Sequence, residues 1–193
     1  KGEALWNQTF EIQNPIISIC QNVVALGDYN GRTIYIMDTE KTIGEIDTKM
    51  PIRNFAVSAN GIVAAVLDDT ADVTWIYVFD SSGNTLVYFK TTMKDSGYPL
   101  CVTISENGYL AGVSYLYMDN GMMRSSVAFY NFGPVGQNEI DNFVSSYDYM
   151  DTIVPFVKFL GNEKAVAVAD NRLVFYEGGQ KPVSIADILL DRQ

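Results

Sequence analysis

The sequence contains no histidine. This absence excludes Ser-His-Asp and Cys-His nucleophile pairs, HExxH zinc sites and acid–base steps that depend on an imidazole. Cysteine is scarce as well: Cys20 and Cys101 lack the spacing of metal ligands and are too few for a disulfide framework. We therefore predict that both cysteines are small buried residues with free thiols.

Positive charge is also in short supply. The 13 lysines and arginines face 23 aspartates and glutamates, which gives a formal net charge of -10 at pH 7. Binding to nucleic acid needs clustered Lys and Arg, so nucleic acid is not expected as a partner. A calcium ion, an amine or a basic protein would suit the acidic field better. No Asp-x-Asp-x-Asp-Gly calcium loop is present, however, and the sequence predicts neither a metal site nor a cofactor.

Long apolar runs are missing too. No stretch approaches the roughly 20 apolar residues of a membrane span, and there is no signal peptide. The sequence starts at Lys1 rather than at a methionine. We interpret it as a processed or trimmed chain from which an upstream signal or anchor could be missing.

Four copies of one unit are present instead. Each copy begins at a proline followed by an apolar run, and the four prolines are Pro15, Pro51, Pro99 and Pro155. A short polar turn and a small apolar strand follow, and then a third strand with a shared signature: "IYIMD", "IYVFD", "VAFYN" and "LVFYE". A fourth, more variable strand completes each copy. Four antiparallel strands in about 40–50 residues are the unit of a β-propeller blade.

We therefore predict an all-β, β-propeller-like fold of four four-stranded antiparallel blades in one domain over residues 1–193. The repeats cover approximately residues 15–50, 51–98, 99–154 and 155–190, and residues 1–14 hold an extra outer strand. If the four blades close into a ring, residues 8–12 should pair with residues 173–176. If they are part of a larger seven- or eight-bladed propeller, residues 183–190 should pair there instead. We favour the second case, in which exposed blade faces would also allow a homo-oligomer.

Several segments carry a resemblance to known proteins. The turn "FDSSGNTLVYF" is similar to the hairpins of quinoprotein-type propellers, whereas the Gly-His and Trp-Asp pairs of WD40 repeats are missing. The segments "DSGYPLCVTIS", "VSYLYMDNG" and "VAFYNFGPVGQNEID" resemble an uncharacterised family of Gram-positive bacterial propeller-like proteins. The resemblance implies an extracytoplasmic β-domain at the cell surface, anchored by an N-terminal transmembrane segment. It implies no catalytic residue.

Candidate binding residues gather on one predicted face of the propeller, which carries the loops between blades and the loops between second and third strands. They are Tyr29, Asp68, Asp69, Asp95, Tyr98, Tyr117, Asp119, Asp148, Tyr149 and Asp151. Exposed tyrosines offer flat and rigid contact area, although Asp also forms turns and strand tyrosines also cover blade edges. The loop around Met118, Met122 and Met123 would place apolar residues at an exposed hairpin tip, which suggests contact with a partner.

We predict from this pattern a non-catalytic extracytoplasmic binding or scaffolding module that contacts a protein or a cell-wall glycan. The alternative is a glycoside hydrolase or another hydrolase that uses paired carboxylates on the same face, such as Asp68 with Asp69 or Asp148 with Asp151. A shallow surface lined by tyrosines would favour binding, and two convergent carboxylates in a deep pocket would favour hydrolysis.

Overall fold

The structure, a computed structural model, describes residues 4, 6–70, 73–92, 96–119, 121–150 and 152–190. These residues form four separate four-stranded sheets, and in each sheet the strands pair antiparallel with their neighbours in the sequence. The predicted all-β fold of four four-stranded antiparallel blades is confirmed. We number the blades 1 to 4 in chain order.

Each blade is a simple meander. Blade 1 consists of β1 (Pro15–Cys20), β2 (Val23–Asp28), β3 (Thr33–Met37) and β4 (Thr42–Asp47). Blade 2 consists of β5 (Ile52–Val57), β6 (Val63–Thr70), β7 (Val73–Phe79) and β8 (Thr85–Thr92). Blade 3 consists of β9 (Tyr98–Ile104), β10 (Leu110–Asp119), β11 (Met122–Asn131) and β12 (Phe143–Met150). Blade 4 consists of β13 (Phe156–Phe159), β14 (Lys164–Val168), β15 (Arg172–Glu177) and β16 (Val183–Leu189).

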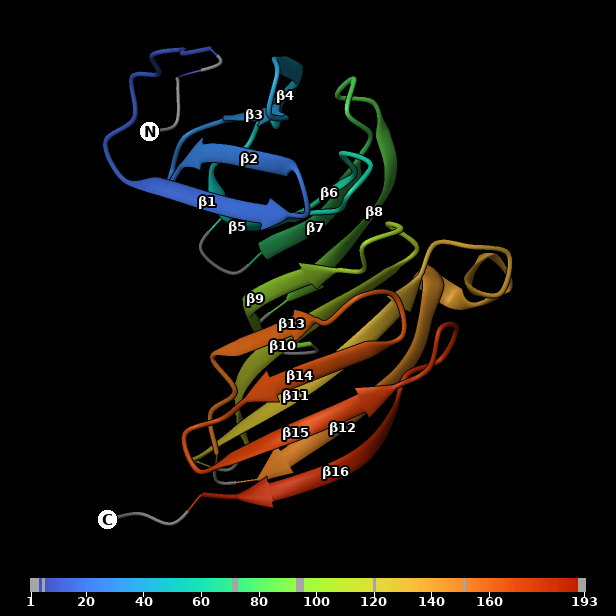
Figure 1. Cartoon of the computed structure of the whole chain (residues 1–193). Coiled ribbons are helices and arrows are strands. Elements are labelled where there is room, and N and C mark those ends of the chain that lie inside the picture. Colours follow the sequence, from blue (N-terminus) through green and yellow to red (C-terminus); the bar gives the residue numbers. More distant parts are fainter. Residues whose placement is uncertain are drawn as a thin grey trace.

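The blades follow one another from blade 1, in blue, to blade 4, in orange and red (Figure 1). Their first strands are the innermost, because β1, β5, β9 and β13 contact one another in succession and line one groove of about 640 Å³. Each first strand starts at the recurring proline or directly beside it. Proline lacks an N–H, so it is tolerated at the first residue of a strand and poorly in the middle of a ladder.

The shared third-strand signature has a common geometry. In every blade a β-bulge separates the third and fourth letters of the signature, at Ile36/Met37, Val78/Phe79, Phe129/Tyr130 and Phe175/Tyr176. A bulge increases the local twist of a strand. Each outer strand is therefore set at the same angle to its blade, which allows the four blades to stack in the same way.

Three apolar layers hold the blades together, one at each contact between neighbouring blades. Strand β6 shows why its sequence "VAAVL" is apolar throughout: Val63 and Ala65 belong to the layer shared with blade 1, whereas Ala64 and Val66 belong to the layer shared with blade 3. Successive strand residues point to opposite faces of a sheet, so both faces of this blade are buried. Full burial of a valine side chain contributes about 1.5–3 kcal/mol.

The connection from β11 to β12 contains two short 3₁₀ helices, η1 (Gly136–Asn138) and η2 (Ile140–Asn142), and projects from the sheets in Figure 1. Among the described residues, neither helix has the length or the apolar character needed to cross a membrane.

The outer strand of blade 4 decides between the two predicted pairings. Strand β16 pairs with β15, with Leu189 opposite Arg172 and Val183 opposite Glu177. Residues 8–12 do not pair with residues 173–176, so that alternative is wrong. Residues 6–12 form no strand and lie against blade 1, where the ring of Phe10 contacts the ring of Tyr35. The predicted extra outer strand at the N-terminus is therefore unpaired.

Close approach of two backbones makes Gly44 irreplaceable in this fold. A Cβ atom at Gly44 would lie 1.8 Å from the backbone oxygen of Ser81 in blade 2. We expect Gly44→Ala to lower the free energy of unfolding by about 2–3 kcal/mol, because blades 1 and 2 must move apart. Urea denaturation measures this loss. Gly121→Ala is the control: nothing lies within 4 Å of its Cβ position, and only the positive φ of 83° opposes the change. A loss no larger than the control's loss of about 1 kcal/mol would contradict the close packing.

Candidate functional site

The candidate residues that the structure describes lie on turns or near strand ends and separate into several groups. Tyr29 follows β2, and Asp68 and Asp69 lie near the end of β6. Tyr98 begins β9, and Asp148 and Tyr149 lie near the end of β12. The backbone of Asp119 ends β10, but its side chain lies outside what the structure describes. Asp95 and Asp151 are outside the described residues.

The first group is held by an arginine that the sequence analysis did not single out. Arg53 forms an ion pair with Asp68 through its Nε atom and donates a hydrogen bond to the hydroxyl of Tyr29. Its guanidinium also lies over the Tyr29 ring, 5.0 Å from the centroid. Tyr98 is close by: burial, and then the charge of Asp68, raise the pKa of its phenol. Arg53 thus joins blade 2 to Tyr29 of blade 1, and Tyr98 of blade 3 lies nearby.

Asp68 and Asp69 do not form a convergent pair of acids. Asp68 is bound to Arg53, whereas Asp69 accepts a 3.4 Å hydrogen bond from the indole N–H of Trp75. The two carboxyl groups therefore have separate partners, one in blade 2's first strand and one in its third strand. Within the described ranges, no group of three or more Cys, Asp or Glu residues could hold a metal ion.

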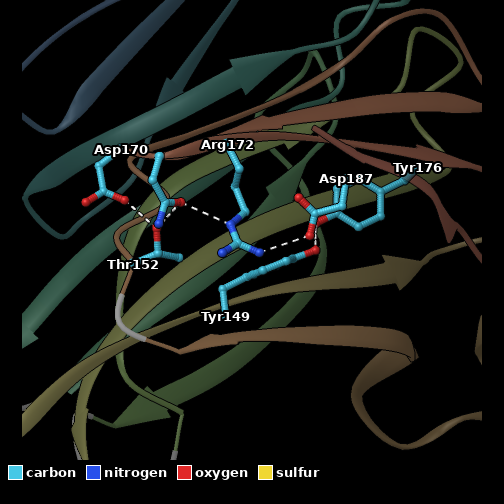
Figure 2. A network of polar contacts seen from close by, with 7 residues as sticks. Tyr149, Thr152, Asp170, Arg172, Tyr176 and Asp187 are labelled. Atoms are coloured by element: carbon cyan, nitrogen blue, oxygen red, sulfur yellow. Dashed lines mark hydrogen bonds and ion pairs between the residues drawn. The ribbon is translucent and has the colours of Figure 1, made fainter. Parts of the chain in front are cut away.

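Tyr149 belongs to a second group that joins blade 4 to blade 3 (Figure 2). Its hydroxyl lies 2.5 Å from the hydroxyl of Tyr176, and burial is the main reason why the pKa of both phenols is raised. Arg172 lies beside this pair and donates hydrogen bonds to Asp187, at 3.0 Å, and to Asn171, also at 3.0 Å. The Tyr149 side chain is buried. It fastens one blade to the next and offers no free surface.

The third group lies on the hairpin of β10 and β11. With ten residues each, these two strands are the longest among those described. Met118 and Met123 are cross-strand partners near the tip and are 65% and 47% exposed. Met122 follows the turn and Met150 pairs with Arg124 in the next strand, and these two methionines are also exposed. We call Met118, Met122, Met123 and Met150 the methionine tip.

Tyr117 and Asp148 lie directly beside the methionine tip. The Tyr117 hydroxyl donates a 2.9 Å hydrogen bond to Asp148, and the Arg124 guanidinium lies over the Tyr117 ring, 4.3 Å from its centroid. Burial and the carboxylate of Asp148 raise the pKa of the Tyr117 phenol. The ring is therefore neutral and held in one orientation, as a preformed contact surface requires.

A pocket of about 430 Å³ opens next to these residues, between β8 of blade 2 and the facing side of blade 3. Aromatic rings form much of its wall, and hydroxyl groups, one lysine and two aspartates complete it. The lining includes Phe89, Lys90, Tyr115, Tyr117, Ser126, Tyr130, Phe143, Ser146 and Asp148. Aromatic walls with a few polar groups are typical of pockets that hold one side chain or one small ligand.

A buried pair of tyrosines forms the floor of this pocket. The hydroxyls of Tyr115 and Tyr130 lie 2.8 Å apart, so each satisfies the other away from water. Burial raises the pKa of Tyr130 to about 12 and that of Tyr115 well above its ordinary value of 10. The floor of the pocket is therefore uncharged at neutral pH.

Of the residues that line the pocket, Tyr117 and Asp148 were among the binding residues predicted from the sequence, and the others were not. Lys90 and Phe89 belong to blade 2 and Ser126, Phe143 and Ser146 to blade 3, so the pocket exists only where the two blades meet. No local pattern marks these residues. Arg53 and Arg124 had a usable signal, because arginine is rare in this chain and both lie within strands.

A comparison with protein families decides the affiliation of this chain. The family of unknown function DUF5711 matches residues 1–193. The chain belongs to this family. No curated protein matches it in sequence.

Solved structures with the same fold are β-propellers of low sequence identity. Hsv2 of Kluyveromyces marxianus is 11% identical, with a TM-score of 0.59 over 91% of this chain and 61% of that one. Hsv2 of Kluyveromyces lactis is 11% identical, with a TM-score of 0.56 over 89% of this chain and 60% of that one. The Pan2 WD40 domain of Neurospora crassa is 8% identical, with a TM-score of 0.52 over 81% of this chain and 46% of that one. This DUF5711 chain spans about three fifths of the length of the Hsv2 chains, and the likeness concerns the fold alone.

The buried tyrosine pair leads to a prediction about alkaline pH. Between pH 10 and about 12 the unfolded chain loses the Tyr130 proton while the folded chain keeps it. The stability that this phenol contributes is complete below pH 10 and is lost as the pH rises to about 12. Over this range the free energy of unfolding should fall by about 2 kcal/mol more in the wild type than in Tyr130→Phe.

Urea denaturation at pH 8, 10, 11 and 12 provides the measurement. Tyr109→Phe removes an exposed phenol and should follow the wild-type curve. Parallel curves for Tyr130→Phe and the wild type would show that the pocket floor does not hold its proton.

Proposed function

We propose that this DUF5711 chain is a non-catalytic binding module that holds a protein partner at the methionine tip of blade 3. The observation that carries the proposal is the exposure of the tip: Met118, Met122 and Met123 are 65%, 49% and 47% exposed. Four of the seven methionines of the chain lie at this one corner. Flexible thioether side chains adapt to irregular apolar surfaces and are common where proteins bind other proteins.

The methionine tip has exposed side chains on both sides of the hairpin of β10 and β11. Met118 and Met123 are paired on the side that faces blade 4, whereas Met150 lies beside Tyr117 and Arg124 on the side that faces blade 2. A partner that covers the tip buries apolar surface on both sides of the hairpin. Each Å² of apolar surface removed from water contributes about 25 cal/mol of favourable free energy. The tip is therefore suited to a concave or two-sided partner surface.

The neighbouring pocket supplies a place for an anchor residue. Protein interfaces often depend on one large side chain that enters a preformed pocket, with less specific apolar contacts around it. Tyr117 and Asp148 are held ready by their hydrogen bond, and Lys90 lies in the same pocket. A partner side chain in the pocket, with the methionine tip packed beside it, would combine these two features.

A cell-wall glycan is the second candidate ligand. Aromatic rings, hydroxyls, Lys90 and Asp148 in one pocket match the apolar faces and hydroxyl groups of a sugar. In either case the proposal assigns the module to the outer side of the cytoplasmic membrane, held by an N-terminal membrane anchor. Its support is the resemblance of "VAFYNFGPVGQNEID" and related segments to anchored propeller-like proteins.

A photo-crosslinking residue placed at Met122 tests the protein partner in cells of the source organism. We expect one or more discrete crosslinked proteins from Met122, and none from a matched probe at Leu86 of β8, which is similarly exposed on another blade. The triple variant Met118→Ser, Met122→Ser, Met123→Ser should keep the wild-type melting temperature, because its changes are on the surface. It should lose at least tenfold of its binding to the crosslinked protein, as expected when a binding hot spot is removed.

Purified cell-wall sacculi test the glycan. The result that supports a glycan ligand in place of a protein partner has two parts. The chain co-sediments with the sacculi, and it loses this binding in Tyr117→Phe and Asp148→Asn but keeps it in the triple methionine variant. Equal crosslinking at Met122 and Leu86, with no binding to sacculi, would contradict both.

A further inference from the structure

The face of blade 4 that points away from blade 3 is apolar and uncovered. Val157, Val174 and Tyr176 pack toward blade 3, so the residues that alternate with them point the other way. Two cross-strand rows lie on this outer face. They are Phe156–Val168–Leu173–Ile188 and Lys158–Val166–Phe175–Ala186. Phe156 and Ile188, at the two ends of the first row, are 45% and 49% exposed.

The corresponding row of residues in blade 2 is buried, because blade 2 lies between two other blades. On the face of blade 2 that meets blade 3, the corresponding row is Asn54–Val66–Ile76–Phe89. Val66 and Ile76 are completely buried there, because blade 3 covers them. The outer face of blade 4 thus carries apolar residues like those that blade 2 buries against blade 3, but no blade covers them among the described residues.

Blade 1 carries a matching feature at the opposite end of the array. Ile34 and Ile36 pack toward blade 2, so Tyr35 points away from it. The segment of residues 6–12 lies on this side: Phe10 packs on Tyr35 with ring centroids 4.5 Å apart, and Gln8 accepts a hydrogen bond from Thr42. Trp6, Phe10 and Ile12 are half-buried, whereas residues 7, 8, 9 and 11 are exposed. Residues 9–12 thus alternate as in a strand, although the segment has no strand partner among the described residues.

The position of Phe10 is that of an outer strand of a preceding blade. At the contact of blades 2 and 3, Phe89 of outer strand β8 packs on Tyr130 of third strand β11, with centroids 4.5 Å apart. At the contact of blades 3 and 4, Tyr147 of outer strand β12 packs on Tyr176 of third strand β15, at 5.3 Å. Phe10 makes a similar contact on the same face of third strand β3 of blade 1, but two residues earlier in the strand signature, at Tyr35.

We propose that further propeller blades of the same natural polypeptide, outside residues 1–193, cover both ends of this array. One blade packs on the outer face of blade 4. The blade that packs on blade 1 is formed by three strands of that additional polypeptide, with residues 8–12 as its fourth, outer strand. The ladder of that blade then supplies the backbone partners that residues 8–12 lack, and no open apolar face remains.

A second copy of this chain fits the observations less well. If blade 4 of a second copy packed on blade 1, its own outer strand β16 would come to the place where residues 6–12 already lie. Two outer strands would then compete for one position. An additional blade of only three strands would leave the place of its outer strand free for residues 8–12, so this conflict does not arise.

Ile188→Asp in the complete natural polypeptide tests the cover over blade 4. A covered Ile188 makes the aspartate a buried unpaired charge, and we expect the melting temperature to fall by about 5–10 °C. The matched control is Leu86→Asp, which places the same charge on outer strand β8 at a residue that is 51% exposed, against 49% for Ile188. The control should shift the melting temperature by no more than about 2 °C. Equal shifts for the two variants would overturn the proposal.

Hydrogen exchange of the same wild-type polypeptide tests the outer strand and does not depend on a variant that folds. In a strand with one partner, alternate amides of residues 8–12 form ladder hydrogen bonds. We expect these amides to exchange at least about a hundredfold more slowly than the amides between them. Uniformly fast exchange over residues 8–12 would overturn the proposal. So would a natural polypeptide without further repeats, or a dimer of residues 1–193 that Ile188→Asp dissociates.

Discussion

Burial of both faces of a β-sheet is the constraint on which this structure depends. A meander of four short strands cannot hide two apolar faces by itself, so each sheet must lie between two others. The chain meets this demand with second strands that contain an apolar run, such as "VAAVL" at the start of Val63–Thr70. It also has a bulge at the same place in every pairing of a third strand with its outer strand. Identical bulges give the blades a common twist, and small side chains such as Ala64 and Ala65 let the sheets come close.

The candidate site follows from where this stacking is incomplete. Near the inner strands the blades touch, and polar groups there join them, as Arg53 of blade 2 does with Tyr29 of blade 1. Further out, between β8 and blade 3, a space lined by rings and hydroxyls remains. The hairpin of β10 and β11 is longer than the other hairpins described, so its methionines extend past the packed layers. Surface that is not needed for stacking is thereby available for recognition.

The repeats were predictable because their signals are local. Prolines at strand starts, turns at Asn60-Gly61 and Asn107-Gly108, and four similar third strands can be recognised within a few residues of each other, and the glycines of those turns do have positive φ angles. The roles of individual tyrosines were not predictable. Tyr117 and Tyr149 both lie near the end of a strand, yet one lines a pocket and the other is buried against Tyr176. Which of these happens depends on the blade that lies opposite, and that blade comes from another part of the sequence. The pocket itself joins Lys90 to Asp148 across two blades, so no single repeat contains its pattern.

The order of strands within each blade has a consequence for how the chain folds. In the part of the chain that the structure describes, every sheet is built from four consecutive strands, and no strand crosses from one sheet to another. The contacts within a blade therefore join strands that are neighbours in the sequence, so a blade can form without strands from a distant part of the chain. During synthesis, blade 1 has all its strands once Asp47 has left the ribosome, and each later blade finds a finished sheet on which to pack. The chain can thus assemble in the direction in which it is translated, with the apolar face of the newest blade as the template for the next.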